Sequence, residues 1–167
     1  MMQTFKIEGI DWLQQYVDLE DEVLDLGCGI MNITGKLKCK IIFGIDAYQP
    51  YIDELKAKGH TYVYCGRIEK YLPDFKKNSF DVVMSIDSIE HLVKPAALKV
   101  IVQMERIAKK RVVIFTPIGF VKNDREENTI LQKHRCGFVP SELEAMGFET
   151  FIREGGDKPS FLAVKDI

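Results

Sequence analysis

The chain has 167 residues, of which 46% are hydrophobic and 29% charged, and its formal net charge is -2. This length and balance fit one core, so we expect a single domain over residues 1–167. The near-neutral charge argues against a nucleic-acid partner, because phosphate contacts dominate such binding. No apolar stretch approaches the roughly 20 residues that span a bilayer, so no membrane association is expected.

The four cysteines, Cys28, Cys39, Cys65 and Cys136, form no paired spacing, and no histidines near them complete a zinc-type motif. We therefore expect reduced thiols and no metal site. The stretch from Met1 to Glu8 lacks the basic region and apolar run of a secretory signal. Together these features predict a cytoplasmic protein.

The predicted elements begin with a helix within residues 1–20, where Ile10, Leu13 and Val17 share one face and pack on the core. Short β-branched runs then alternate with longer helical segments, the pattern of an α/β domain with a mostly parallel sheet. The five runs lie at 22–26, 41–45, 61–65, 80–86 and 111–115. Helices are expected at 50–58, at 97–108 and from Pro140 to Gly147.

The end of the chain predicts an antiparallel pair. Two apolar runs, 148–153 and 160–164, flank the turn Gly155-Gly156-Asp157-Lys158-Pro159, which is typical of a hairpin. The longest irregular stretch is the polar segment 117–139. Loops of that length in compact domains are usually functional or disordered.

A tight turn follows the first strand, where the sequence reads Gly27-Cys28-Gly29. Glycine allows steep backbone dihedrals and lets a ligand approach without a Cβ in the way. We expect a helix to start beyond the turn, so that backbone N–H groups meet a ligand's carboxylate, phosphate or ribose. A tight turn without a ligand is the alternative.

Asp46 follows the second strand, at about the 20-residue distance from Gly27 expected for an acid that binds ribose hydroxyls. A carboxylate at this point can accept two hydrogen bonds from a vicinal diol. The alternative is that Asp46 only caps a turn or the helix that begins near Pro50. Its register with the glycine turn favours the ribose role.

The sequence Val-Leu-Asp-Leu-Gly-Cys-Gly at 23–29 resembles the first motif of the Rossmann-like (class I) S-adenosylmethionine-dependent methyltransferases. Three later regions match the family in the same order. Gly44-Ile45-Asp46 resembles its ribose-binding acid motif. The other two resemble the small-molecule group called methyltransferase type 11, and they are 78–83 with Ile89-Glu90-His91-Leu92, and 134–138 with 142–148. The resemblance covers about residues 20 to 150. It implies a three-layer α/β sandwich with a seven-stranded, mostly parallel sheet and an antiparallel last strand.

The resemblance also assigns residues to the cofactor, S-adenosylmethionine. Asp25, Gly27 and Gly29 would line its methionine end, and Asp46 would hold the ribose. The complete set that it implies is Asp25, Gly27, Cys28, Gly29, Asp46, Ala47, Gly66, Arg67, Ile68, Ser85 and Ile86.

The chain departs from the family pattern in two places. Ile30-Met31 stands where a further glycine is common, which gives a bulkier turn. Arg67 stands where an acid commonly binds the adenine amine, and an arginine offers no acceptor. Glu69 or backbone groups would then have to take that role.

Catalytic candidates follow the fourth strand, where open α/β sheets bind ligands. A base is needed only if the methyl acceptor must lose a proton, and Asp87, Glu90 and His91 lie in this region. His91 titrates near neutrality; its alternative is a structural histidine bonded to a loop. His134, in the long loop, either contributes to an acceptor pocket or is solvated or structural. His60 precedes the third strand, at the opposite end.

Missing motifs narrow the acceptor. Ser85-Ile86-Asp87-Ser88 lacks the Asn/Asp-Pro-Pro-aromatic motif of amino-group methylation on DNA bases or glutamine, and no Pro-Cys nucleophile follows the strand. The sequence therefore predicts an S-adenosylmethionine-dependent methyltransferase with a small-molecule acceptor. Two alternatives stay open: an inactive cofactor-binding protein, and an NAD-dependent oxidoreductase, for which the GxGxxG spacing lacks its glycine at Asn32.

Overall fold

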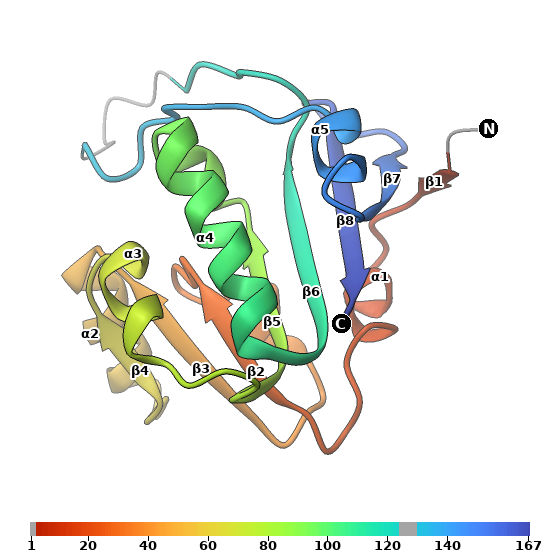
Figure 1. The fold of residues 1–167 in the computed structure, drawn as a ribbon. Coiled ribbons are helices and arrows are strands. Elements are labelled where there is room, and N and C mark those ends of the chain that lie inside the picture. Colours follow the sequence, from red (N-terminus) through yellow and green to blue (C-terminus); the bar gives the residue numbers. More distant parts are fainter. Residues whose placement is uncertain (1–2, 124–129) are drawn as a thin grey trace.

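The computed structural model describes residues 3–123 and 130–167, and within them the chain forms one mixed sheet (Figure 1). The strand order is β1-β7-β8-β6-β5-β2-β3-β4, and only β8 runs antiparallel to its neighbours. The bounds are β1 (Gln3–Phe5), β2 (Glu22–Leu26), β3 (Ile41–Asp46), β4 (Val63–Cys65), β5 (Phe80–Ile86), β6 (Ala108–Pro117), β7 (Glu149–Arg153) and β8 (Ser160–Asp166). The predicted parallel sheet with an antiparallel last strand is confirmed, with β1 as an additional eighth strand.

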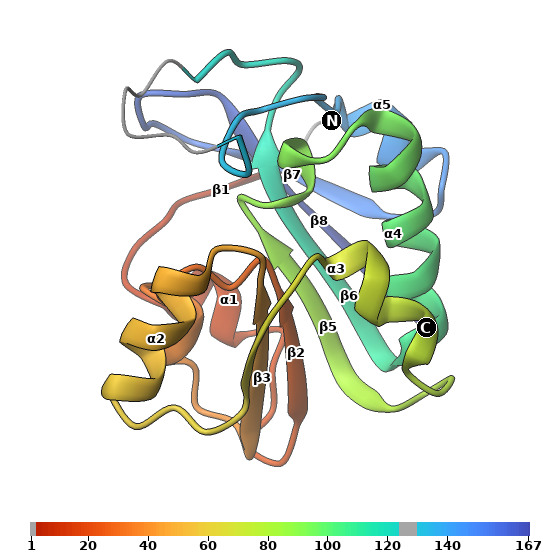
Figure 2. The same ribbon diagram turned by 90° about the vertical axis from the view of Figure 1, so that its left-hand side faces the viewer.

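Helices cover both faces of the sheet, which makes the predicted three layers (Figure 2). Their bounds are α1 (Asp11–Gln14), α2 (Gln49–Ala57), α3 (Ile68–Tyr71), α4 (Lys94–Ile107) and α5 (Pro140–Glu144). Short 3-10 helices are η1 (Thr34–Lys36), η2 (Leu72–Asp74) and η3 (Ile89–His91). Helices α3, α4 and α5 share one core cluster with the sheet, whereas α1 and α2 pack on the other face.

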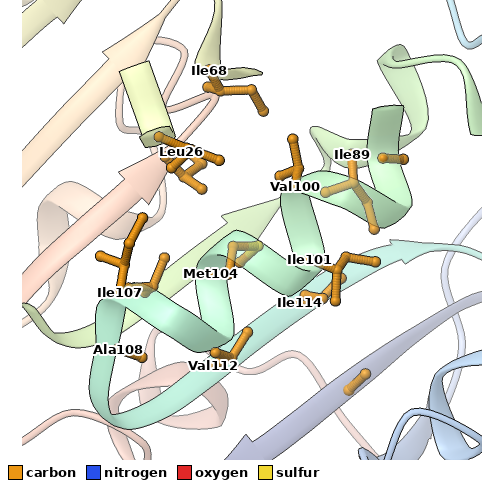
Figure 3. Packing of buried hydrophobic residues seen from close by; sticks show 14 of the residues in the cluster. Leu26, Ile68, Ile89, Val100, Ile101, Met104, Ile107, Ala108, Val112 and Ile114 are labelled. Atoms are coloured by element: carbon orange, nitrogen blue, oxygen red, sulfur yellow. The ribbon is translucent and has the colours of Figure 1, made fainter. Parts of the chain in front are cut away.

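The longest helix, α4, packs against β5 and β6 through one apolar stripe (Figure 3). Val100, Ile101, Met104 and Ile107 recur at the three- and four-residue intervals of one helix face, and each is at most 1% exposed. Burying each such side chain stabilises the fold by about 1.5–3 kcal/mol. The helix therefore packs on β5 and β6 and also contacts η3, which follows β5 in the chain.

Two helices expected from the sequence are shorter than predicted or absent. Residues 1–20 contain the four-residue helix α1 and the edge strand β1 in place of one longer helix, although Trp12 and Leu13 do pack on the core. The segment 27–40, which is described throughout, contains only the 3-10 helix η1. Met31 adopts a φ of 52°, and Thr34 Oγ1 donates to Asp25 Oδ2 at 2.6 Å. These features keep the short connection in successive turns.

The C-terminal hairpin forms as predicted from β7 and β8. Its register places Ser160 opposite Pro117, the last residue of β6. Because β8 runs antiparallel, the loop 154–159 lies at the edge where the parallel strands end. Among the described residues, no helix has the length and apolar character needed to cross a membrane.

Candidate functional site

A cavity of about 960 Å³ opens at the carboxyl ends of the central strands. This is the edge at which open α/β sheets bind ligands, and the volume falls in the roughly 300–1,000 Å³ range of small-molecule sites. The glycine turn and Asp46 line one part of it. Asp87, Glu90, His91 and His134 line another.

Both glycines of the turn adopt left-handed backbone conformations, with φ of 74° at Gly27 and 52° at Gly29. A Cβ at Gly27 would lie 1.8 Å from Ser88 Oγ, so that position accepts no side chain without movement. A Cβ at Gly29 would meet nothing within 4 Å. Gly27 is thus fixed by packing, while Gly29 leaves its surroundings open on the cavity wall.

Asp46 connects the glycine turn to the start of α2. Its Oδ2 accepts the Gly29 N–H at 2.9 Å, and its Oδ1 accepts the Tyr48 N–H at 2.8 Å. The turn-capping bonds that formed the alternative are therefore present. Each carboxylate oxygen has a second lone pair, so the two bonds leave acceptor capacity on the cavity wall.

Neither Asp25 nor Cys28 lines the cavity. Asp25 is 1% exposed and bonded to Thr34. Burial raises the pKa of Asp25 to about 7, against the lowering effect of the Thr34 hydrogen bond. The Cys28 side chain packs with Met31 where a Cβ on Gly44 would otherwise lie, and burial raises the pKa of its thiol. Cys28 can reach a ligand only through its backbone.

Of the remaining cofactor candidates, Ala47, Arg67 and Ile68 line the cavity. Arg67 Nε donates to Glu69 Oε1 at 2.6 Å, and Glu69 also lines the cavity. Glu69, one of the two replacements expected for the family's adenine-binding acid, therefore lies on the cavity wall.

Gly66, Ser85 and Ile86 do not line the cavity. A Cβ on Gly66 would lie 2.2 Å from the Tyr71 ring, which explains its glycine by packing. Ser85 is fully buried in β5, and Ile86 packs against the core beneath the sheet.

The structure brings together three residues from two distant segments: Glu90 and His91 of η3, and His134 of the long loop. The two imidazole rings meet edge to face, with centroids 4.9 Å apart. Asp87, which lines the same cavity, adopts a φ of 49°. Desolvation by the surrounding cavity wall raises the pKa of Asp87 to about 6, while Arg153 and Lys158 act to lower it.

Glu90 is 2% exposed, and burial together with the smaller effect of the Asp87 charge raises its pKa to about 8. Burial lowers the pKa of His91, opposed by backbone carbonyls such as that of Lys133. Burial also lowers the pKa of His134, as does the neighbouring His91. The wall therefore favours neutral imidazoles at neutral pH.

The loop that carries His134 is fixed to η3 by backbone hydrogen bonds. The N–H groups of Arg135 and Cys136 donate to the Glu90 carbonyl at 2.8 and 3.1 Å. Gly137 passes so close to Gly119 that a Cβ would lie 2.2 Å from its backbone. These contacts anchor the described end of the loop predicted at 117–139; its residues 124–129 lie outside the described part of the chain.

Sequence reasoning missed several residues of the cavity wall, among them Tyr51, Gln132, Arg153 and Lys158. Tyr51 Oη accepts a hydrogen bond from Gln132 Nε2, which joins α2 to the long loop. Arg153 and Lys158 flank the hairpin turn. The predicted antiparallel pairing could have identified them, because a strand antiparallel to β6 begins where β6 ends and so places the preceding turn at the cavity.

The methyltransferase domain family matches residues 24–116 of this chain. The fold is similar to a SAM-dependent methyltransferase from Methanosarcina mazei, with 16% identity, a TM-score of 0.71, and 97% of this chain and 98% of that chain covered. It is also similar to a SAM-dependent methyltransferase from Archaeoglobus fulgidus, with 15% identity, a TM-score of 0.69, and 92% of this chain and 89% of that chain covered. A third similar structure is magnesium protoporphyrin IX methyltransferase from Synechocystis with bound SAH, with 14% identity, a TM-score of 0.65, and 94% of this chain and 79% of that chain covered. A search of curated proteins finds no match.

The site and sheet define a Rossmann-like α/β domain with a ligand cavity at the carboxyl ends of its strands. The chain belongs to the methyltransferase domain family, whose match covers more than half of its length. The predicted resemblance to class I, type 11 methyltransferases is confirmed.

Proposed function

We propose that this domain binds S-adenosylmethionine in the cavity and transfers its methyl group to a small-molecule acceptor. The observation that carries the proposal is the position of Asp46. Its carboxylate is held by the Gly29 and Tyr48 N–H groups and retains acceptor capacity on the cavity wall. A ribose diol would donate to that carboxylate across the glycine turn.

The wall offers groups that suit the other parts of the cofactor. Gly29 leaves space beside the turn for the methionine portion. Glu69, oriented by Arg67, supplies an acceptor for an adenine amine, next to the apolar side chain of Ile68. We infer that Asp25 supports this site from behind, by holding Thr34 and the segment after the turn.

S-adenosylmethionine supplies an electrophilic methyl group on a sulfonium sulfur. The chain then has to align the acceptor and exclude water, which is the main requirement of a direct displacement. Asp87 and His91 line the same cavity, close in sequence to Ser88, which packs against the glycine turn. We assign the acceptor to this part of the cavity, where either group can take a proton from an acceptor that must lose one.

The oxidoreductase alternative fits less well. A dinucleotide places its pyrophosphate at the N-terminus of the helix after the glycine turn. In this chain the helical structure of the segment 27–40 is limited to η1, and Asn32 occupies the position of the third glycine.

We also place the protein in the cytoplasm, which suits cysteines that are all free thiols.

The proposal is tested by thermal unfolding and calorimetric titration with S-adenosylmethionine, S-adenosylhomocysteine and NAD. A ligand at about 100 times its Kd stabilises the fold by about 2.7 kcal/mol, so the two sulfur nucleosides should raise the Tm. Asp46→Ala should weaken their binding by roughly 1.5–3 kcal/mol, the scale of hydrogen bonds to a charged group.

Asp53→Ala is the matched control, because Asp53 is exposed on α2 and bonds Gln49. It removes the same charge near the site and should leave affinity unchanged. A Tm rise with NAD alone, or equal affinities for the Asp46 and Asp53 variants, would overturn the assignment. Methyl transfer to a panel of small metabolites then separates an active enzyme from a binding protein.

A further inference from the structure

Three side chains on the cavity wall form a ligand set for a metal ion. One potential ligand atom each from Glu90, His91 and His134 lies within 4.8 Å of the others. Two imidazoles and one carboxylate form a donor set that suits divalent transition metals such as Zn²⁺, Mn²⁺, Fe²⁺ and Co²⁺. We propose that this triad binds one such cation in the wall of the cavity.

His134 is oriented as a metal ligand would be. Its Nδ1 lies 2.6 Å from the Val121 carbonyl oxygen, and only a protonated Nδ1 makes that contact a hydrogen bond. Nε2 then carries the lone pair. The backbone N–H of His134 also donates to Asn123 Oδ1 at 2.9 Å. A backbone carbonyl that fixes the ring through its second nitrogen is the usual outer-shell partner of a histidine bound to a metal.

Glu90 and His91 both lack partners that a cation would supply. The Glu90 carboxylate accepts hydrogen bonds from Thr116 Oγ1, at 3.1 Å to Oε2, and from its own backbone N–H. No lysine or arginine in the described part of the chain forms an ion pair with it. A carboxylate this deeply buried requires a proton or a positive partner. His91 Nδ1 is buried with no hydrogen-bond partner in the described chain, which is rare for a polar atom.

The backbone holds the triad in place without help from a cation. The Glu90 carbonyl accepts the N–H groups of Arg135 and Cys136, so the residue next to His134 is bonded to the residue before His91. Lys94 adds a second anchor by donating to the Gly137 carbonyl at 2.6 Å. The ligands are therefore positioned by the fold, which favours binding because little ordering remains.

The coordination would be incomplete on the cavity side. All three ligands line the cavity, and three protein ligands leave at least one position open, as in catalytic rather than structural zinc sites. Resting on the proposed function, we infer that the open position receives an oxygen atom of the methyl acceptor, with His91 serving as a ligand and Asp87 left as the proton acceptor. The acceptor class would then be a hydroxyl or carboxyl compound able to bind a cation.

The test uses the full chain, treated with EDTA and dialysed, titrated with Co²⁺, Mn²⁺ or Zn²⁺ alone by calorimetry. We expect one equivalent to bind. Glu90→Gln and His134→Ala should weaken binding roughly 100-fold or more, because outer-shell partners of ligands already contribute 10- to 100-fold. His60→Ala is the matched control: His60 is the only other histidine, is also half-buried, and does not line the cavity.

Two further measurements keep the proposal falsifiable. Thermal unfolding in EDTA should show that the Glu90 and His134 variants remain folded, since glutamine can still accept from Thr116. The Co²⁺ complex should show visible d–d bands without thiolate charge transfer, and acetohydroxamate should shift those bands by taking the open position. Absent binding, or equal binding by folded Glu90, His134 and His60 variants, would overturn the site. Unshifted bands would overturn the open position.

This experiment contains no S-adenosylmethionine. The metal site can therefore fail while the cofactor assignment stands, and the reverse also holds.

Discussion

Replacing the buried carboxylate of Asp25 by an amide should raise the free energy of unfolding at pH 8. Asp25 is 1% exposed, and it accepts Thr34 Oγ1 at 2.6 Å. Burial raises the pKa of Asp25 to about 7; the Thr34 bond lowers it and the Asp46 charge raises it. In Asp25→Asn the amide oxygen can keep the Thr34 bond, so the substitution removes the charge and retains the contact.

The direction follows from proton binding. The pKa of Asp25 is raised from 3.8 to about 7 on folding, so between these values the folded state holds a proton that the unfolded chain has lost. Stability therefore falls as pH rises through this window, by about 1.4 kcal/mol per pH unit. The whole displacement corresponds to roughly 4 kcal/mol, taken as an upper value. Above pH 7 the loss is complete.

Urea unfolding measures this effect, followed by fluorescence of the single tryptophan, Trp12, which is buried. Glu90 and Asp87 also have raised pKa values, so the informative quantity is the difference between Asp25→Asn and the wild type. That difference should be small near pH 4 and should grow in favour of the variant towards pH 8.

Asp81→Asn is a control of opposite sign. Burial alone would raise the pKa of Asp81. The hydrogen bonds from the Glu22 N–H at 2.9 Å and from Lys109 at 3.4 Å outweigh that effect, so the net shift of the pKa is downward. Its ionised form stabilises the fold above the unfolded pKa, and that contribution is lost as pH falls. Asp81→Asn should therefore be less stable than the wild type at pH 8. Parallel pH curves for the wild type and Asp25→Asn would refute the reasoning.

Packing at Gly27 and along α4 can be tested by substitution. Gly27→Ala should lower the free energy of unfolding by roughly 1–3 kcal/mol or more, because φ is 74° and its Cβ would lie 1.8 Å from Ser88 Oγ. Adding Ser88→Gly should recover part of that loss in urea unfolding; no recovery would contradict the contact. Ile101→Ala should lower the free energy by roughly 2–5 kcal/mol, whereas Val102→Ala, at a position 54% exposed, should stay within about 0.5 kcal/mol. Equal losses would contradict the packing of α4.

The strands could be predicted because their signal is local. β5 begins and ends at the residues predicted from its apolar run, Phe80 to Ile86, and β2 likewise spans 22–26. Strands covered on both faces must be apolar along their length. The helices predicted after Leu26 and before Asp21 could not be delimited in the same way. Their lengths depend on contacts between distant segments, such as the pairing of β1 with β7.

The site was predictable only in part, because its contacts join distant segments. Strand alternation places Asp25 on the same face of β2 as Val23, beneath Thr34, which is why its side chain does not line the cavity. The proposed cation ligands depend on the hydrogen bonds from Arg135 and Cys136 to Glu90. No spacing rule for metal motifs covers such a pairing, so the sequence predicted no metal site.

One contact links the two parts of the cavity. The glycine turn belongs to the part proposed for the cofactor, and Ser88 immediately follows Asp87 in the part proposed for the acceptor. A Cβ on Gly27 would come within 2.5 Å of Ser88 Cβ, so the Ser88 side chain fills the space beside Gly27 and the two segments are in direct contact. Glu90 lies two residues beyond Ser88, in η3. A change at Gly27 should therefore weaken cation binding at the triad as well as cofactor binding, although Gly27 touches neither imidazole. If calorimetry showed Gly27→Ala losing only cofactor affinity, the segment 88–91 would be held by α4 and the long loop alone.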